Sequence, residues 1–499
     1  MNIGVEQELD LRNRNATDLV RRHSDIWAVV DTLSGCVGAQ PAYQFVLRMI
    51  LLRIIEPTGD ARSPWDLFAA EALEPEDEEA SIDTVLEAAL RKWVGESTAE
   101  TEAWEMRDFI MNPTVETTAA LHAMVLAVAA LRGDAVEVFD LVLERYSRAE
   151  GDGGDYFTPR SLVSLVVSLL DPRPGERVFD PACGSAGFLV AAADHARRAE
   201  TGGEDGALVG RDVNRGAWQI GRMNLLAHGL RGDLGAGPIN AFLGGIRGEE
   251  GHCDVVMLNP PFGQKDWASD TEIKTRDWPF GRPARSNANF AWLQAAFSSL
   301  RAGGRAGVLM PATSTRDSRL AAREITANLV KGDVIDALVT LPDGLFPHLR
   351  VSPCLWILSH GKGTVRGSGE RDRHGQFLFV DARNMGEQVT RGQRILPDSA
   401  IAQIAEVVRT WRSPDWGSFV PDQHGAGHGW WATATRADIE AREFDLTPER
   451  YVPSGQHQEG TDQQRDNDEE IRELTWRLLR RTERVQELDG RLREVLSQW

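Results

Sequence analysis

Six short apolar runs, separated by segments with helical spacing, lie in the middle of this 499-residue chain and limit its fold most strongly. They are Arg177 to Asp180, Ala207 to Asp212, Val255 to Leu258, Ala306 to Met310, Val334 to Thr340 and Cys354 to Ser359. Strands that alternate with helices form a mostly parallel sheet with helices on both faces, because parallel neighbours need a crossover connection. The sequence therefore predicts an α/β domain of the doubly wound, Rossmann-like type.

Segments of different composition flank these runs. Residues 15–147 are rich in Ala, Leu, Val and Glu with apolar residues at helical spacing, which predicts an all-helical N-terminal domain over 1–148. A Gly/Asp break at 151–155 opens the α/β domain, expected over 149–453, and a polar linker follows at 454–468. The apolar heptad stripe of residues 469–499 predicts a coiled-coil-like C-terminal helix and favours docking on a partner over folding back.

Net charge and cysteine content limit the substrates and bound metals that the sequence favours. The net charge of −20 by itself favours a substrate other than nucleic acid, unless a local patch or a separate basic subunit grips it. The four cysteines lie far apart without a C-x-x-C pair, so neither a disulfide framework nor a metal site is expected.

The most apolar run, Phe45 to Ile55, is about half of a bilayer span and indicates a buried helix. With no signal-like start, the chain is expected in the cytoplasm, away from membranes.

Two acidic residues and a small-residue turn predict a nucleoside site. In VFDPACGSAGF, Asp180 ends a strand, and Gly184, Ser185 and Gly187 form a turn before a helix. Such a turn lets an anionic group approach the amide groups of the helix closely. The next strand ends near Asp212, whose carboxylate can accept hydrogen bonds from both hydroxyls of a ribose. Because many βα turns carry glycine only for packing, the second acid supports the prediction more than the turn does.

The motif Asn259-Pro260-Pro261-Phe262 directly follows an apolar strand and predicts chemistry on an exocyclic amine. Such an amine on adenine is a poor nucleophile because its lone pair is delocalised into the ring. The side-chain oxygen of Asn259 and the carbonyl of Pro260 can each accept one of its hydrogens, which aims the lone pair at a methyl donor. Pro261 stiffens the loop, and Phe262 offers an apolar face to a base taken out of its stack. A proline-rich turn with a core phenylalanine is the alternative.

With these motifs the chain resembles the adenine-specific DNA methyltransferase (modification) subunit of type I restriction-modification systems, most strongly over residues 153–360. The resemblance implies that S-adenosyl-L-methionine is the cofactor and that DPACGSAGF is its loop. It also implies that Tyr156, Phe157 and Thr158 cover the methionine end of the cofactor, and that Asp212 binds its ribose. The substrate would be an adenine flipped out of double-stranded DNA, methylated on its exocyclic N6 amine.

The same resemblance implies an assembly. A DNA-recognition (specificity) subunit would receive the helix at 469–499, and a restriction (nuclease/translocase) subunit would join for cleavage. Two copies of this chain would surround one recognition subunit.

Three departures from the family's pattern accompany the resemblance. Ala186 replaces a glycine and is expected to place a methyl group where the cofactor passes. Asn240 stands where relatives carry an acid for the cofactor's adenine, and it is expected to hydrogen-bond the amino group of that adenine. The segment from Thr313 to Arg319 differs from the usual glycine-containing loop and receives no predicted role.

Two other functions stay open on sequence grounds. Methyltransferases of protein glutamine or RNA guanine amino groups also use an Asn-Pro-Pro-aromatic motif, but theirs usually ends in Tyr and lacks the flanking helical segments found here. A non-catalytic scaffold that joins recognition and cleavage subunits is the second. The intact Asn259-Pro260-Pro261-Phe262 motif argues against it, and Ala186 argues weakly for it.

Overall fold

The structure is a computed structural model that describes most of the chain between residues 23 and 452. The described ranges are 23–55, 64–73, 85–86, 88–89, 114–149, 158–199, 206–346, 351–363, 370–418 and 429–452, without 132, 245, 247 and 391. The chain divides into two compact units, Met1–Phe419 with Trp431–Val452 and Val420–Trp430 with Pro453–Trp499. Nearly all of the second unit, including the predicted linker and terminal helix, lies outside the described residues, as do Tyr156 and Phe157.

The described residues of the N-terminal part are helical, as predicted. The helices are α2 (Ser24–Val37), α3 (Ala39–Ile54), α4 (Pro64–Leu73), α7 (Val115–Ala129) and α8 (Ala135–Ala149). Helix α3 confirms the buried helix expected at Phe45 to Ile55, and even Arg48 is only 2% exposed. Its guanidinium is tolerated there because it donates to the backbone oxygen of Gln44 and the side chain of Gln219. Within the described residues, no helix is long and apolar enough to cross a membrane.

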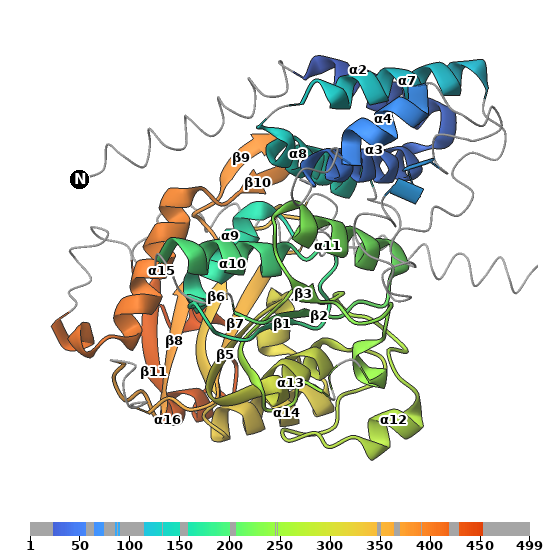
Figure 1. The fold of residues 1–499 in the computed structure, drawn as a ribbon. Coiled ribbons are helices and arrows are strands. Elements are labelled where there is room, and N and C mark those ends of the chain that lie inside the picture. Colours follow the sequence, from blue (N-terminus) through green and yellow to red (C-terminus); the bar gives the residue numbers. More distant parts are fainter. Residues whose placement is uncertain are drawn as a thin grey trace, which may run out of the picture. The chain divides into compact units, whose positions relative to one another are not determined.

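Nine strands of the described chain form one sheet in the order β11-β8-β6-β7-β5-β4-β1-β2-β3 (Figure 1). They are β1 (Val178–Asp180), β2 (Leu208–Gly210), β3 (Gly232–Asp233), β4 (Cys253–Leu258), β5 (Leu300–Pro311), β6 (Ile335–Thr340), β7 (Pro353–Ser359), β8 (Gln376–Asp381) and β11 (Trp431–Thr435). All six predicted runs are strands. The sheet is mixed rather than parallel throughout, because β7 runs antiparallel to both β5 and β6, and β11 antiparallel to β8. Strand β7 follows β6 without an intervening helix, so it can return beside β6 without a crossover.

Helices cover both faces of the sheet, as the predicted doubly wound class requires. Figure 1 shows α9 (Arg160–Leu170), α10 (Gly187–Ala199), α11 (Arg215–Ala227) and α15 (Asp398–Arg412) on one face. On the other face lie α13 (Asn289–Ser299) and α14 (Leu320–Lys331), with α12 (Asp270–Thr275) beyond them. The α/β class expected from the sequence is therefore confirmed.

The region beyond Phe379, where the sequence pattern weakens, completes the sheet. Strands β8 and β11 form its edge, α15 packs on α9, and a hairpin lies between β8 and α15. The remaining short elements are β9 (Glu387–Thr390), β10 (Gln393–Ile395), α16 (Arg436–Glu440), η1 (Ala241–Leu243), η2 (Ala312–Arg316), η3 (Pro414–Ser418) and η5 (Pro448–Arg450).

Candidate active site at the carboxyl ends of the strands

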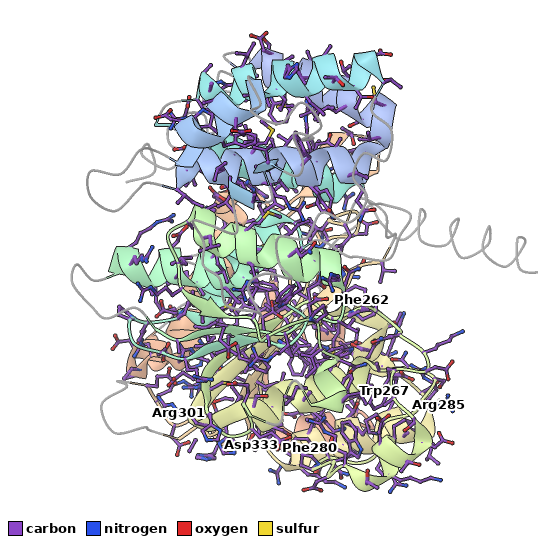
Figure 2. The ribbon with its side chains drawn as sticks, turned by 45° about the vertical axis from the view of Figure 1, so that its right-hand side comes forward. Phe262, Trp267, Phe280, Arg285, Arg301 and Asp333 are labelled. Carbon is purple, nitrogen blue, oxygen red and sulfur yellow. The ribbon has the colours of Figure 1, made fainter. Side chains whose placement is uncertain are left out.

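Three sequence-predicted residues lie at the carboxyl ends of three neighbouring strands. Asp180 ends β1, Asp212 lies two residues past β2, and Asn259 directly follows β4. Strand β1 pairs in parallel with both β2 and β4, so the three ends lie side by side, with about 4.8 Å between adjacent strands. Figure 2 shows Phe262 well away from Arg301 and Asp333, which lie at the opposite ends of the strands. The carboxyl edge of a parallel sheet is where such folds bind ligands.

The turn after β1 is held by the acid that follows β2. One oxygen of Asp212 accepts a hydrogen bond from the backbone N–H of Gly184 at 2.8 Å, and the other accepts from Asn214 at 2.8 Å. The side chain of Asn224 donates to the carbonyl of Ser185 at 2.8 Å, which ties the turn to α11. Helix α10 begins at Gly187, so its first amide groups lie at this turn. The predicted loop residues and Asp212 therefore form one hydrogen-bonded unit.

The methyl group of Ala186 faces the interior and not the open side of the turn. Ala186 is fully buried in the left-handed region with a φ of 60°, a conformation that costs an L-residue about 1 kcal/mol. A Cβ added to Gly221 of α11 would lie 2.9 Å from the carbonyl oxygen of Gly184, so the absence of a side chain at Gly221 lets α11 approach the turn closely. A Cβ at Gly184, in contrast, would meet no atom within 4 Å. The packing therefore does not support the expectation that the Ala186 methyl group narrows the space for a cofactor.

The two acids form a buried pair in which burial disfavours the charged forms. Burial raises the pKa of Asp180 well above its usual value, and the nearby charge of Asp212 raises it further, against a hydrogen bond from Ala182. Burial also raises the pKa of Asp212, although backbone N–H donors oppose this shift. Among the described residues, no cation is a source of either shift. A positively charged group close to them would favour their charged forms.

Exposed apolar side chains surround Asp212, and the sequence reasoning did not find them. Val213 is 66% exposed and Ile239 is 37% exposed, and the backbone N–H of Ile239 donates to the carbonyl of Asp212 at 2.7 Å. Leu243, at 54%, follows closely in the chain. The side-chain oxygen of Asn240 already accepts the N–H of Phe242 at 2.9 Å, which caps η1 and leaves its amide N–H groups as the donors. An apolar residue directly after a strand-end acid is the signal that could have found these exposed side chains.

The Asn259 side chain is ordered by a contact with the segment before α9. Asn259 is 7% exposed, and its Nδ2 donates to the hydroxyl of Thr158 at 3.0 Å. Within the described residues, neither Oδ1 of Asn259 nor the carbonyl of Pro260 has a hydrogen-bond partner. Two acceptors are therefore available together, as binding an amine with two hydrogens requires.

The side chain of Phe262 is partly exposed, and contacts with Phe346 and Asn289 hold the loop around it. Its ring meets Phe346 edge to face, with 5.7 Å between the centroids. The next residue, Gly263, has a φ of 65°, and its N–H donates to the side chain of Asn289 at 2.9 Å. Asn289, buried at the start of α13, was not found from the sequence because a lone Asn there is also typical of a helix start.

An aromatic cluster connects this loop to the segment that follows Asn240. The ring of Phe242 lies 4.6 Å from that of Trp267 and 4.4 Å from that of Trp292. Trp267, labelled in Figure 2, is only 4% exposed and donates to the carbonyl of Ala284. The cluster packs as core, so it supports the two loops and is not a surface for a base.

A histidine between α8 and α11 gives the fold a pH-dependent contact. His228 hydrogen-bonds the carbonyl of Asn224 at 3.0 Å and approaches Asp140 at 3.4 Å. Burial lowers the pKa of His228, but the hydrogen bond and charge of Asp140 outweigh it and raise the pKa above its usual value. A raised pKa means that the stabilisation is complete below about pH 6.5, the unfolded value, and is lost as the pH rises through the folded pKa.

We therefore expect His228→Gln to lower the free energy of unfolding by about 1 kcal/mol at pH 6 and by less at pH 8.5. Urea unfolding of both proteins at the two pH values measures this difference. The variant Asp140→Asn should show the same pH dependence, and a constant gap between wild type and His228→Gln would contradict the assignment.

Comparisons with known proteins show the family and the fold of this chain. The family N-6 DNA Methylase matches residues 132–460. The methylase subunit of the type I restriction enzyme HindI from Haemophilus influenzae is 30% identical over 365 residues, 72% of this chain and 77% of that protein. The MjaIX methylase subunit from Methanocaldococcus jannaschii is 28% identical over 63% of this chain and 55% of that protein. A type I methyltransferase subunit from Streptococcus thermophilus shares the fold, with a TM-score of 0.64, 18% identity and coverage of 86% of this chain and 99% of that one.

The fold and the family match define a DNA methyltransferase that acts on the N6 amine of adenine. The chain belongs to the N-6 DNA methylase family and, within it, to the methylase subunits of type I restriction enzymes. Its activity is the methylation of the N6 amine of adenine, so the readings as a glutamine or RNA methyltransferase and as a non-catalytic scaffold are set aside.

Proposed function

We propose that this chain methylates a flipped adenine through the two free acceptors at the end of β4. Oδ1 of Asn259 and the carbonyl of Pro260 would each accept one hydrogen of the target amine, and Phe262 would lie against the face of the base. Asn259 cannot take up a proton, so the amine would attack directly and lose its proton afterwards. Pro261 limits the loop to conformations that keep the Pro260 carbonyl outward. The observation that carries the proposal is a pair of acceptors with no hydrogen-bond partner among the described residues, at the same edge of the sheet as Asp212.

S-adenosyl-L-methionine is the methyl donor that the buried acid pair fits, and when bound it supplies an electrophilic methyl group. Asp180 would face its positive groups, while Gly184, Ser185 and Gly187 would leave space for its carboxylate at the start of α10. Asp212 would accept from the ribose hydroxyls. Val213 and Ile239 would sandwich the adenine ring. Asn240 would use its amide N–H toward a ring nitrogen, since its oxygen caps η1.

We further propose the assembly and domain roles that the type I subunits suggest. A specificity subunit would read the DNA sequence and bind the helix at 469–499, across the linker at 454–468. A restriction subunit would join for cleavage, and two copies of this chain would flank one specificity subunit. The helical domain over 1–148 and the catalytic domain over 149–453 would meet through contacts such as Arg48 with Gln219. The net charge of −20 fits an enzyme that relies on this partner to hold DNA.

A variant without the Asp212 carboxylate tests both the proposed cofactor and the proposed function. We expect Asp212→Ala to weaken binding of S-adenosyl-L-methionine about 10- to 100-fold in calorimetry, because charge-assisted hydrogen bonds are worth about 1.5–3 kcal/mol. The control is Asp233→Ala, which removes an exposed carboxylate on β3 and should leave the affinity within about twofold.

Co-expression with a specificity subunit, followed by sequencing of host DNA for N6-methyladenine, should show one modified motif with the wild-type chain. The motif should be unmodified with Asp212→Ala. Unchanged affinity in that variant, or wild-type DNA without modified adenine, would contradict the proposal.

A further inference from the structure

The two ends of the Asn259 amide have opposite chemistry, so its orientation decides whether the site can hold an amine. An oxygen facing the target accepts a hydrogen from the amine, whereas an NH2 group facing it places donor against donor. In a buried site, an unmade hydrogen bond of this kind costs about 1–3 kcal/mol. A side chain whose two orientations are similar in energy would spend much of its time turned the wrong way.

The contact that holds the amide in the orientation seen here comes from a residue 101 positions earlier in the chain. Nδ2 of Asn259 donates to Oγ1 of Thr158 at 3.0 Å, and Oδ1 has no partner among the described residues. The hydroxyl thus engages the nitrogen end of the amide and leaves the oxygen end for a ligand. Because Asn259 is only 7% exposed, bulk water offers little competition for this bond.

Thr158 is held firmly enough to have this effect. Pro159 follows it, with a φ of −53°, and caps α9, which begins at Arg160. The apolar face of α9 is buried against β4 and β5, and β4 is the strand that ends at Asn259. Arg160 also pairs with Asp140 and Glu144 of α8. The helix that positions Thr158 and the strand that positions Asn259 therefore pack on each other directly.

We infer that Thr158 is a positioning residue for methyl transfer: its hydroxyl oxygen accepts the amide N–H of Asn259 and keeps Oδ1 turned toward the target amine. This inference rests on the proposed role of Asn259. It differs from the role that the family resemblance implies for Thr158, which is contact with the methionine end of the cofactor. The two roles predict different effects of mutation. Loss of a positioning residue slows the chemical step, whereas loss of a cofactor contact lowers the affinity for the cofactor.

The test uses the full chain in complex with its specificity subunit and a DNA duplex that carries the target motif. Thr158→Val keeps the shape of the side chain but removes the hydroxyl, and Thr158→Ser keeps the hydroxyl. We expect Thr158→Val to lower the single-turnover rate of methylation about 10- to 100-fold at saturating cofactor and DNA. Calorimetric affinity for S-adenosyl-L-methionine and the melting temperature should stay near wild type. Thr158→Ser should recover most of the rate.

A double variant separates this inference from the proposed function. If Thr158 acts through Asn259, adding Thr158→Val to Asn259→Ala should cause no further loss of rate. A Thr158→Val protein with weakened cofactor binding but a normal saturated rate would overturn the positioning role. A Thr158→Ser protein as slow as Thr158→Val would overturn it as well. A fully active Asn259→Ala protein would instead reject the proposed role of Asn259 itself.

Discussion

The Asn259→Ala variant is expected to methylate adenine about 100- to 1000-fold more slowly than wild type while still binding S-adenosyl-L-methionine normally. Removing a single preorganised polar group from a transition-state site typically costs this much. The alanine eliminates the oxygen that is proposed to accept one amine hydrogen, while the Pro260 carbonyl remains. The turn after β1, the proposed cofactor loop, depends on Asp212 and Asn224 and not on Asn259, so cofactor affinity should persist.

Single-turnover methylation of a duplex, with the specificity subunit present, measures this effect. Asn328→Ala is a matched control, because Asn328 is also an internal amide but donates to Phe280, away from Phe262 in Figure 2. That variant should keep its saturated rate even if its stability falls. An Asn259→Ala enzyme within about threefold of the wild-type rate would remove the amide from the mechanism, since a genuine contact to the amine is worth more than about 1 kcal/mol.

The strand-end residues could be predicted because local sequence fixes them. A buried apolar run is followed by a polar residue at Asp180, Asp212 and Asn259, and parallel strands bring their carboxyl ends to one edge. No long-range distance is needed for that conclusion. The six predicted runs, each apolar and bounded by breaks, are strands for the same reason.

Contacts between distant segments could not be predicted in the same way. The bond between Thr158 and Asn259 depends on how α9 packs on β4, and a shift of about 1 Å would break it. Asn289 supports Gly263 across 26 residues, and Gly221 of α11 leaves room for the carbonyl oxygen of Gly184 in the turn after β1. Each is an ordinary residue within its own segment. Only the packed structure gives it a partner.

The end of the sheet beyond Phe379 shows a second limit of sequence reasoning. Strand β11 has a single buried residue, Ala434, and β9 is fully exposed, so neither has a strong apolar pattern. A buried carboxylate on β6, which meets residues from two later segments, helps to attach this region alongside the apolar contacts of β8 and α15. A buried ion pair leaves no periodic signal in the sequence, because each partner is a single charged residue and the two lie in different segments.

Asp336→Ala is expected to lower the free energy of unfolding by about 3–5 kcal/mol, the largest loss of stability that we predict for one side chain. Asp336, on β6, is 1% exposed and accepts hydrogen bonds from Arg373 at 3.1 Å, Arg412 at 3.0 Å and the Trp411 indole at 3.2 Å. Burial alone would raise the pKa of Asp336, but the charges of Arg373, Arg412 and Lys362 hold it far below its usual value.

The alanine would leave the guanidinium of Arg373, itself 2% exposed, in the interior without its main counter-charge, which explains the size of the effect. Asp343→Ala, which breaks an exposed pair with Arg394, should cost less than about 1 kcal/mol and is the control. Because the pKa of Asp336 is depressed, its contribution is present above about pH 4, the unfolded value, and fades as the pH falls toward the folded pKa. Denaturant unfolding at pH 7 measures the two losses, and equal losses for both variants would show that the buried charge network does not attach α15 and the edge of the sheet.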